Sequence, residues 1–146
     1  MMSVFYAHDS ITRILIDHGA DIRMPYPSGN SNCTILHMAA YMGSAAIVEL
    51  LLIKDMDIEA RDRYLQTPLH YAVKGANRFG ERRNNGCART VGVLLRNHAN
   101  PEAENDEGHT PRSMASDYWN RLVNRLLDEG HEAQMALEEL DTLAPE

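Results

Sequence analysis

The chain has 146 residues, a typical length for one domain, and 44% of them are hydrophobic while 24% are charged. This balance is typical of a globular protein and excludes an intrinsically disordered chain. The 21 acidic residues outnumber the 14 Lys and Arg residues and give a net charge of −7. A protein whose whole surface grips nucleic acid phosphates is therefore disfavoured.

The N-terminal residues indicate an intracellular protein. Met1 to Asp9 have neither the basic leader nor the apolar core of a secretion signal, and two cysteines are too few for a disulfide scaffold. We therefore expect a reducing setting, cytoplasmic or nuclear. The apolar run from Ile35 to Ile53 approaches the length that crosses a bilayer, but Gly43 and Ser44 interrupt it. No membrane contact is expected.

A short segment recurs at a distance of 33 residues. Residues 34–40 read TILHMAA, and residues 67–73 read TPLHYAV. Each copy is followed by an aliphatic block, at 47–53 and at 91–95, and then by a polar stretch. A third copy starts at Thr110 and Pro111 and recovers its aliphatic block at 122–127, whereas Ile11 to Ile16 form such a block without a full first segment before it. A fixed period of this length is typical of a repeat protein.

This pattern resembles the ankyrin repeat family, whose motif is Thr-Pro-Leu-His-x-Ala-Ala, a Gly turn, an aliphatic block and a Gly-Ala-Asp ending. The resemblance implies an all-α solenoid of stacked helix-turn-helix repeats with connecting β-hairpin-like loops. Within an ankyrin region at 1–130 we predict a partial repeat at 9–33, a full repeat at 34–66, a full repeat with a ten-residue insertion at 67–109 and a degenerate C-terminal capping repeat at 110–130. A short acidic helix and tail are predicted at 131–146.

The residue types agree with this organisation. A Thr followed by Pro, as at 67–68, starts a helix well, because Thr caps an amide and Pro lacks a donor that would have no partner. The small Ala39, Ala40 and Ala72 let neighbouring helices approach closely. One helix pair cannot bury both of its apolar faces, so stacked repeats have to supply the core.

Two departures from the motif concern helix ends. The left-handed residue that ends the second helix is Gly19 in the first copy, and Asp55 and His98 stand there in the next two. Asp and His are among the few types that tolerate positive φ, so we expect both helices to stop there. Trp119 occupies the place of Gly43, which predicts a different turn in the last repeat.

Thr67 and Thr110 are 43 residues apart, ten more than the period, and the excess lies at 74–86. Three Gly and three Asn residues there predict an extended surface loop that folding does not require. Residues 74–96 hold six basic residues against Glu81, whereas residues 101–146 hold three Arg against 12 acids. The basic segment can pair with the acidic C-terminal part or contact a partner.

No constellation in the sequence predicts catalysis. His37 and His70 stand where the resembling family uses a structural histidine. Cys33 and Cys87 have no neighbouring cysteine, and the sequence contains no His-x-x-x-His pair, Gly-rich phosphate loop or Gly-x-Ser-x-Gly elbow. We therefore expect no catalytic residues, no metal and no cofactor.

The resemblance implies a non-enzymatic module that binds an as yet unidentified protein through its loop tips, or fingertips, and the concave face of the first helices. Aromatic and Arg residues are common interface anchors. The predicted partner-binding residues are Tyr41, Met42, Arg61, Arg63, Tyr64, Tyr71, Lys74, Arg78, Arg82, Arg83, Glu104, Asp106, Glu107 and Tyr118.

Two alternatives remain open. One is an enzyme or small-molecule binder that uses the groove beside the inserted loop, lined by Tyr41, Tyr71, His109 and Asp117. The other is a structural fragment of a larger ankyrin array. The thin apolar cover at the N-terminal end predicts either a monomer or a weak homodimer through that end.

Overall fold

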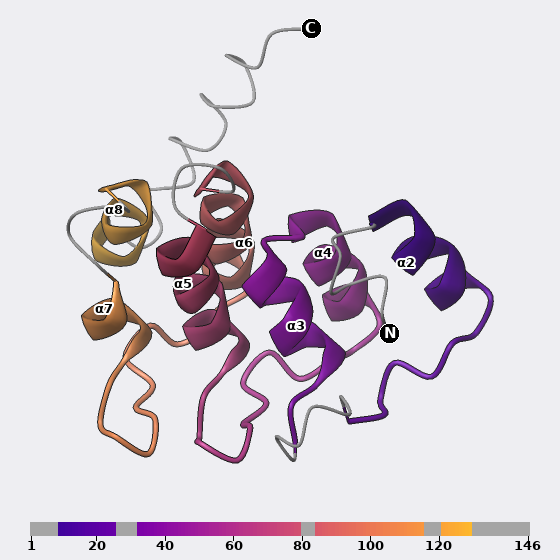
Figure 1. Ribbon diagram of the computed structural model, residues 1–146, viewed down its shortest axis with the longest axis horizontal. Helices are drawn as coiled ribbons and strands as arrows, with labels where there is room; N and C mark the ends of the chain where they lie inside the picture. The colour runs from indigo at the N-terminus through magenta and orange to yellow at the C-terminus, as the bar shows by residue number, and fades with distance from the viewer. Residues whose placement is uncertain (1–8, 26–31, 80–83, 116–120, 130–146) are drawn as a thin grey trace, which may run out of the picture.

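The computed structural model describes residues 9–25, 32–79, 84–115 and 121–129. It contains helices α2 (Asp9–Asp17), α3 (Ile35–Met42), α4 (Ala45–Ile53), α5 (Pro68–Phe79), α6 (Asn84–Arg96), α7 (Pro111–Met114) and α8 (Arg121–Glu129) (Figure 1). The described residues include no β-strand. The predicted all-α repeat solenoid is thereby confirmed.

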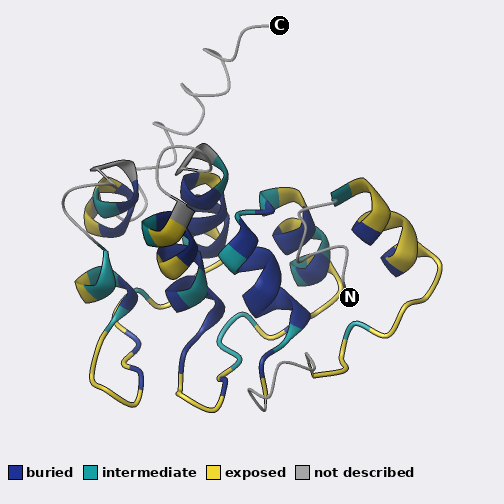
Figure 2. Cartoon of the chain, in the orientation of Figure 1, coloured by how far each residue is buried: buried dark blue, intermediate teal, exposed yellow. Residues whose placement is uncertain are grey.

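The helices form two layers. An inner layer consists of α3, α5 and α7, and an outer layer consists of α2, α4, α6 and α8, with contacts along each layer and between the two helices of each repeat. Two long connections project from one end of the helices: the first finger (residues 54–67) and the second finger (residues 97–110) (Figure 1). Their tips are exposed, whereas the facing sides of the helices are buried (Figure 2).

The expected helix starts and ends are present. Thr34 and Thr110 are extended N-cap residues, and the hydroxyl of Thr110 accepts a hydrogen bond from the Ser113 amide at 3.0 Å. At the ends of the outer helices, Asp55 and His98 have φ of 58° and 67°, where Gly19 has 84°. The prediction that a non-glycine residue takes the left-handed position is confirmed at both sites.

Small and aliphatic side chains fill the space between the layers. Ala39, Ala40 and Ala72 are completely buried, as the motif predicts. Leu51 and Leu94 are equivalent residues of α4 and α6, and both are completely buried as well. In the last repeat Val123, Leu126 and Leu127 are buried, which continues the core through α8.

The prediction of an extended loop at 74–86 is wrong. α5 has 12 residues where α3 has 8, and α6 has 13 where α4 has 9, so most of the insertion lengthens the two helices. Residues 80–83, between the helices, lie outside the described part. The composition was misleading because Gly75 and Gly86 serve contacts between helices rather than flexibility.

The lengthened helices pack closely on the preceding repeat. A Cβ atom on Gly75 would lie 2.0 Å from the backbone oxygen of Tyr41, and one on Gly86 would lie 2.9 Å from the backbone oxygen of Gly43. Gly43 in turn has a φ of 71° and turns the chain between α3 and α4. Three glycines therefore allow the backbones of two repeats to touch at this point.

The two ends of the chain are less completely described. On α2, Thr12 and Ile16 are buried, whereas Ile11, Ile14 and Leu15 are between 42% and 56% exposed. Self-association through this end stays a prediction. The predicted helix and tail at 131–146 and the turn at Trp119 lie outside the described residues. None of the described helices has both the length and the apolar character that crossing a membrane requires.

Candidate functional site

The tips of the two fingers share one local structure. In the first finger the Asp62 amide donates to the Gln66 carbonyl at 3.1 Å, and in the second the Asn105 amide donates to the His109 carbonyl at 2.9 Å. Oδ1 of Asp62 accepts the amides of Tyr64 and Gln66, both at 2.8 Å. Oδ1 of Asn105 accepts the equivalent two amides, at 3.0 and 2.8 Å. A short polar side chain therefore builds each tip.

The fingers are tied to one another by backbone groups. The Arg61 guanidinium donates through Nη1 to the Leu65 carbonyl at 2.6 Å and to the Glu104 carbonyl at 2.7 Å. The Asp106 amide donates to the Tyr64 carbonyl at 3.1 Å. Arg61 was predicted as a partner contact. In the structure its guanidinium links the backbones of the two fingers.

His37 and His70 are buried, and each links the start of its own helix to the finger that follows it in the chain. Nδ1 of His37 accepts the Thr34 amide at 3.1 Å, and its Nε2 donates to the Gln66 carbonyl at 3.0 Å. His70 repeats this arrangement with Thr67 at 3.1 Å and with the His109 carbonyl at 3.1 Å. Burial lowers the pKa of both histidines, which favours the neutral ring that this pattern requires.

Tyr71 links the inner helices to the first finger. Its hydroxyl donates to Oδ2 of Asp62 at 2.9 Å, and its ring makes edge contacts with His37 and Tyr41 at centroid distances of 5.0 and 6.3 Å. Burial, with the nearby Cys33 and Asp62, raises the pKa of Tyr71. The tyrosine is half-buried, so most of this predicted contact residue serves packing.

A hollow of about 260 Å³ lies between the fingers and the inner layer. Four of the predicted residues line it: Tyr64, Lys74, Asp106 and Glu107. Gln66, Asn105, His109 and Met114 also line it and were not predicted as partner contacts. The signal of Gln66, His109 and Met114 in the sequence is weak, because these three stand in or beside the Thr-Pro motif, where a structural role is the first expectation.

The other predicted residues lie outside this hollow. Met42 is 8% exposed, so its side chain offers a partner almost no surface. Tyr41 is half-buried, and Arg78 and Glu104 are exposed. The exposed Arg63 lies 5.1 Å above the Tyr64 ring, a cation–π distance. Arg82, Arg83, Tyr118 and Asp117 fall outside the described residues.

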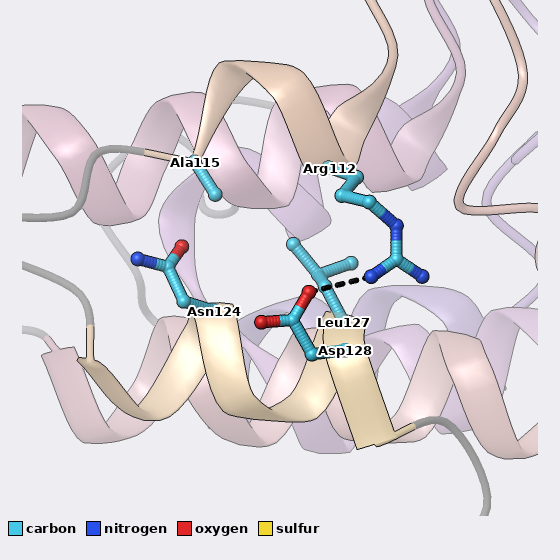
Figure 3. Close-up of a pocket in the computed structure, with 5 residues that line it drawn as sticks. All are labelled: Arg112, Ala115, Asn124, Leu127 and Asp128. Carbon is cyan, nitrogen blue, oxygen red and sulfur yellow. Dashed lines mark hydrogen bonds and ion pairs between the residues drawn. The ribbon is translucent and has the colours of Figure 1, made fainter.

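A second hollow, of about 80 Å³, lies between α7 and α8 (Figure 3). Arg112 reaches across it and donates to Oδ1 of Asp128 at 2.6 Å, and the same guanidinium donates to Oε1 of Glu102 at 2.5 Å. These carboxylates raise the pKa of Arg112. The arginine that replaces the leucine of the motif thus ties the second finger to the last helix pair.

No group of three His, Cys, Asp or Glu side chains in the described ranges could hold a metal ion. Cys33 and Cys87 are both buried as free thiols. The side chains that line the hollow offer hydrogen-bond donors, carboxylates and apolar surface to a bound molecule.

Comparisons with known proteins agree with the repeat architecture. The family described as ankyrin repeats in three copies matches residues 1–80, and the ankyrin repeat family matches residues 64–106. The chain is 34% identical over 77 residues to an ADP-ribosylation factor GTPase-activating protein of Arabidopsis thaliana, covering 52% of this chain and 8% of that protein. It is 35% identical over 86 residues to a transient receptor potential cation channel subfamily A member 1 homolog of Caenorhabditis elegans, covering 58% and 6%.

A putative ankyrin repeat protein of Fowlpox virus is 34% identical over 109 residues, which cover 74% of this chain and 29% of the viral protein. The chain thus spans less than a third of the length of each of these relatives. Ankyrin repeats are protein-interaction modules that generally bind protein partners. The family matches, together with the stacked helix pairs and their projecting fingers, show that this chain belongs to the ankyrin repeat family.

Proposed function

We propose that the chain is a non-enzymatic module that binds a partner protein in the hollow between the two fingers and the inner layer. The observation that carries the proposal is the convergence of Tyr64, Lys74, Asp106 and Glu107 on this one hollow. They come from both fingers and from α5, so their common position depends on the stacking of two repeats.

Charge and exposure support the hollow as the contact. Asp106 and Glu107 are exposed, and Tyr64 is 43% exposed beside them. An aromatic side chain next to charged residues is a common composition for an interface anchor. The backbone beneath these side chains is fixed by Arg61 and by the Asp106 to Tyr64 hydrogen bond, so a partner meets a preorganised surface.

The enzyme alternative has less support. Of the four residues that it invoked, His109 lines the hollow, Tyr41 and Tyr71 do not, and Asp117 lies outside the described residues. A module inside a longer array remains compatible with the length of the relatives. We place the chain in the cytoplasm or nucleus, a proposal supported by its two free thiols.

The proposal is tested by affinity capture with mass spectrometry. The full chain and its variant Asp106→Lys with Glu107→Lys are used as baits under identical conditions. The control is Asp17→Lys with Glu49→Lys, which reverses two exposed acids on α2 and α4, away from the hollow. We expect the hollow variant to lose its partner by at least about tenfold in recovery and the control to retain it. Equal recovery with both variants would refute the hollow as the binding site.

A further inference from the structure

The tip of the first finger contains a leucine with a left-handed backbone. Leu65 has a φ of 55°, and its amide donates to the Asp62 carbonyl at 3.1 Å. Gly108 holds the same position in the second finger, with a φ of 75° and a hydrogen bond from its amide to the Asn105 carbonyl at 3.0 Å. Both fingers therefore close with the same turn, and the last position of this turn requires a positive φ, which glycine adopts without steric cost.

Leucine is poorly suited to this backbone. Among the described residues, the other non-glycine residues with a positive φ are Asn32, Asp55 and His98. Asn, Asp and His are the types that are enriched in this region, whereas a bulky apolar side chain is strained there. Such strain persists only where the surroundings of the residue offset it.

The fold makes little use of the Leu65 side chain. The hydrogen bonds of this residue come from its backbone, because its amide reaches Asp62 and its carbonyl accepts Nη1 of Arg61 at 2.6 Å. Any residue can make these bonds. The side chain is 50% exposed, lies outside the core cluster of the described residues and does not line the hollow beside the finger. A strained residue with so little burial indicates a role in contact with another molecule.

The neighbouring residues make the tip an apolar and well-fixed projection. The tip is exposed and stands away from the helices (Figure 2). Tyr64 is 43% exposed, and the Arg63 guanidinium lies 5.1 Å above its ring. The Tyr64 carbonyl accepts the Asp106 amide at 3.1 Å, so the second finger holds the backbone beneath these side chains. Apolar side chains on a fixed backbone lose little conformational freedom when a partner covers them.

We propose that Leu65 determines partner specificity by inserting into an apolar recess on the surface of the partner protein. The leucine lies on a projecting tip, so the matching surface of the partner is concave and apolar. Tyr64 connects this contact with the hollow, because it lines the hollow and precedes Leu65 in the chain. The inference rests on the proposed function and adds the anchoring side chain and the chemistry of the surface that receives it.

Two substitutions separate folding from binding. Leu65→Gly removes the strain together with the side chain, so this variant should melt at or above the wild-type temperature. Leu65→Met keeps both the strain and an apolar side chain. The binding probe is the purified protein that affinity capture with the full chain identifies. We expect Leu65→Gly to weaken binding of this probe by at least about tenfold and Leu65→Met to bind it within about threefold of the wild type.

Photo-crosslinking tests the contact itself. Leu65→Cys is labelled with benzophenone maleimide, which reacts with an exposed thiol, whereas Cys33 and Cys87 are buried. Ile53→Cys is the matched control, because Ile53 is 79% exposed and lies on α4, away from the finger tip. The label at position 65 should crosslink to the probe among apolar residues of its surface, and the label at position 53 should not.

Four outcomes would overturn the inference. Leu65→Gly melts more than about 2 °C below the wild type, which would make the leucine part of the fold. Leu65→Gly binds the probe as tightly as Leu65→Met does. The full chain captures no protein that crosslinks from position 65. The wild-type chain self-associates and Leu65→Gly disperses it, which would make a second copy the occupant.

Failure of this inference differs from failure of the proposed function. If Leu65→Gly retains the captured protein while reversal of Asp106 and Glu107 releases it, the hollow is the binding site and the inference is wrong. If the reversal releases nothing while Leu65→Gly releases the protein, the inference stands and the hollow is not the site.

Discussion

His37 and His70 act as clamps between successive repeats. Each ring accepts the amide of a capping Thr and donates to a carbonyl at the end of the following finger. Both roles need a neutral ring with its proton on Nε2. A proton on Nδ1 would place two donors against each other, so protonation breaks the link between a helix start and the next finger.

We predict that this clamp makes the protein sensitive to mild acid. The pKa of both histidines is lowered in the folded state from an ordinary value of 6.5. As the pH falls below that value the unfolded chain takes up protons that the folded chain does not bind, so the free energy of unfolding decreases. The free energy of unfolding stops decreasing once the pH is below the pKa that the histidines have in the folded protein. Above about pH 5 most carboxylates stay ionised, so the histidines dominate this window.

The measurement is the melting temperature between about pH 7.5 and about pH 5 for the wild type, His37→Gln and His18→Gln. His37→Gln should be less stable at neutral pH and should lose less stability on acidification. His18→Gln replaces an exposed histidine and should keep the wild-type pH slope. If the melting temperature changed with pH to the same extent in all three proteins, the proposed role of His37 in linking the repeats would be contradicted.

The lengthened α5 and α6 are the elements that distinguish this stack. Gly75 of α5 lies against the backbone of Tyr41 near the end of α3, and Gly86 of α6 lies against Gly43 in the turn between α3 and α4. Asn77, in the added part of α5, donates to the Met114 carbonyl at 2.8 Å, so the same extension also contacts the last repeat. The repeat that carries the insertion is therefore linked to the repeat before it and to the repeat after it.

Gly75→Ala tests this packing. Its Cβ would lie 2.0 Å from the Tyr41 backbone oxygen, and backbone cannot move aside as a flexible side chain can. Alanine is the better helix former, so propensity alone predicts a small gain in stability. We expect the steric overlap to outweigh the gain in helix propensity and to lower the free energy of unfolding by about 1 to 3 kcal/mol.

Denaturant unfolding measures this change. Arg78→Ala, an exposed substitution one helical turn away, is the control and should alter stability by less than about 0.5 kcal/mol. Stabilisation by Gly75→Ala would mean that the helices do not approach as closely as described.

The whole molecule is stable because neighbouring repeats complete each other's core. Inner helices contact inner helices, outer helices contact outer helices, and the histidines and Arg61 add polar links along the same direction. Nearest-neighbour coupling of this kind makes a short stack unfold as a unit.

We predict that a cavity in one repeat destabilises the others. Leu51→Ala and Leu69→Ala each empty a completely buried position and should cost about 2 to 5 kcal/mol. Ile53→Ala is the control, because Ile53 is 79% exposed. Hydrogen exchange followed along the chain should show faster exchange in α6 and α8 as well as in the mutated repeat. Faster exchange confined to one helix pair would show that the repeats unfold independently.

The amino-acid sequence alone determined the repeat period, the helix starts and ends, and the buried positions. These features depend on local chemistry: Thr and Pro start a helix, Asp55 and His98 tolerate positive φ, and small or aliphatic residues at helical spacing form the core. The same local reasoning failed at 74–86, because glycines that permit close helix packing look like glycines of a loop. Nothing next to Gly75 in the sequence indicates that Tyr41 lies against it.

Only the tertiary structure decided what the candidate site contains. Tyr64 is distant in the chain from Asn105 and Met114, and it meets them because one repeat stacks on the next. Burial also reassigned individual residues: Met42 belongs to the core, Tyr71 mostly to the packing between helices, and Arg61 to the link between fingers. A sequence shows which side chains can bind, but whether a group already has a partner depends on which other repeat lies beside it.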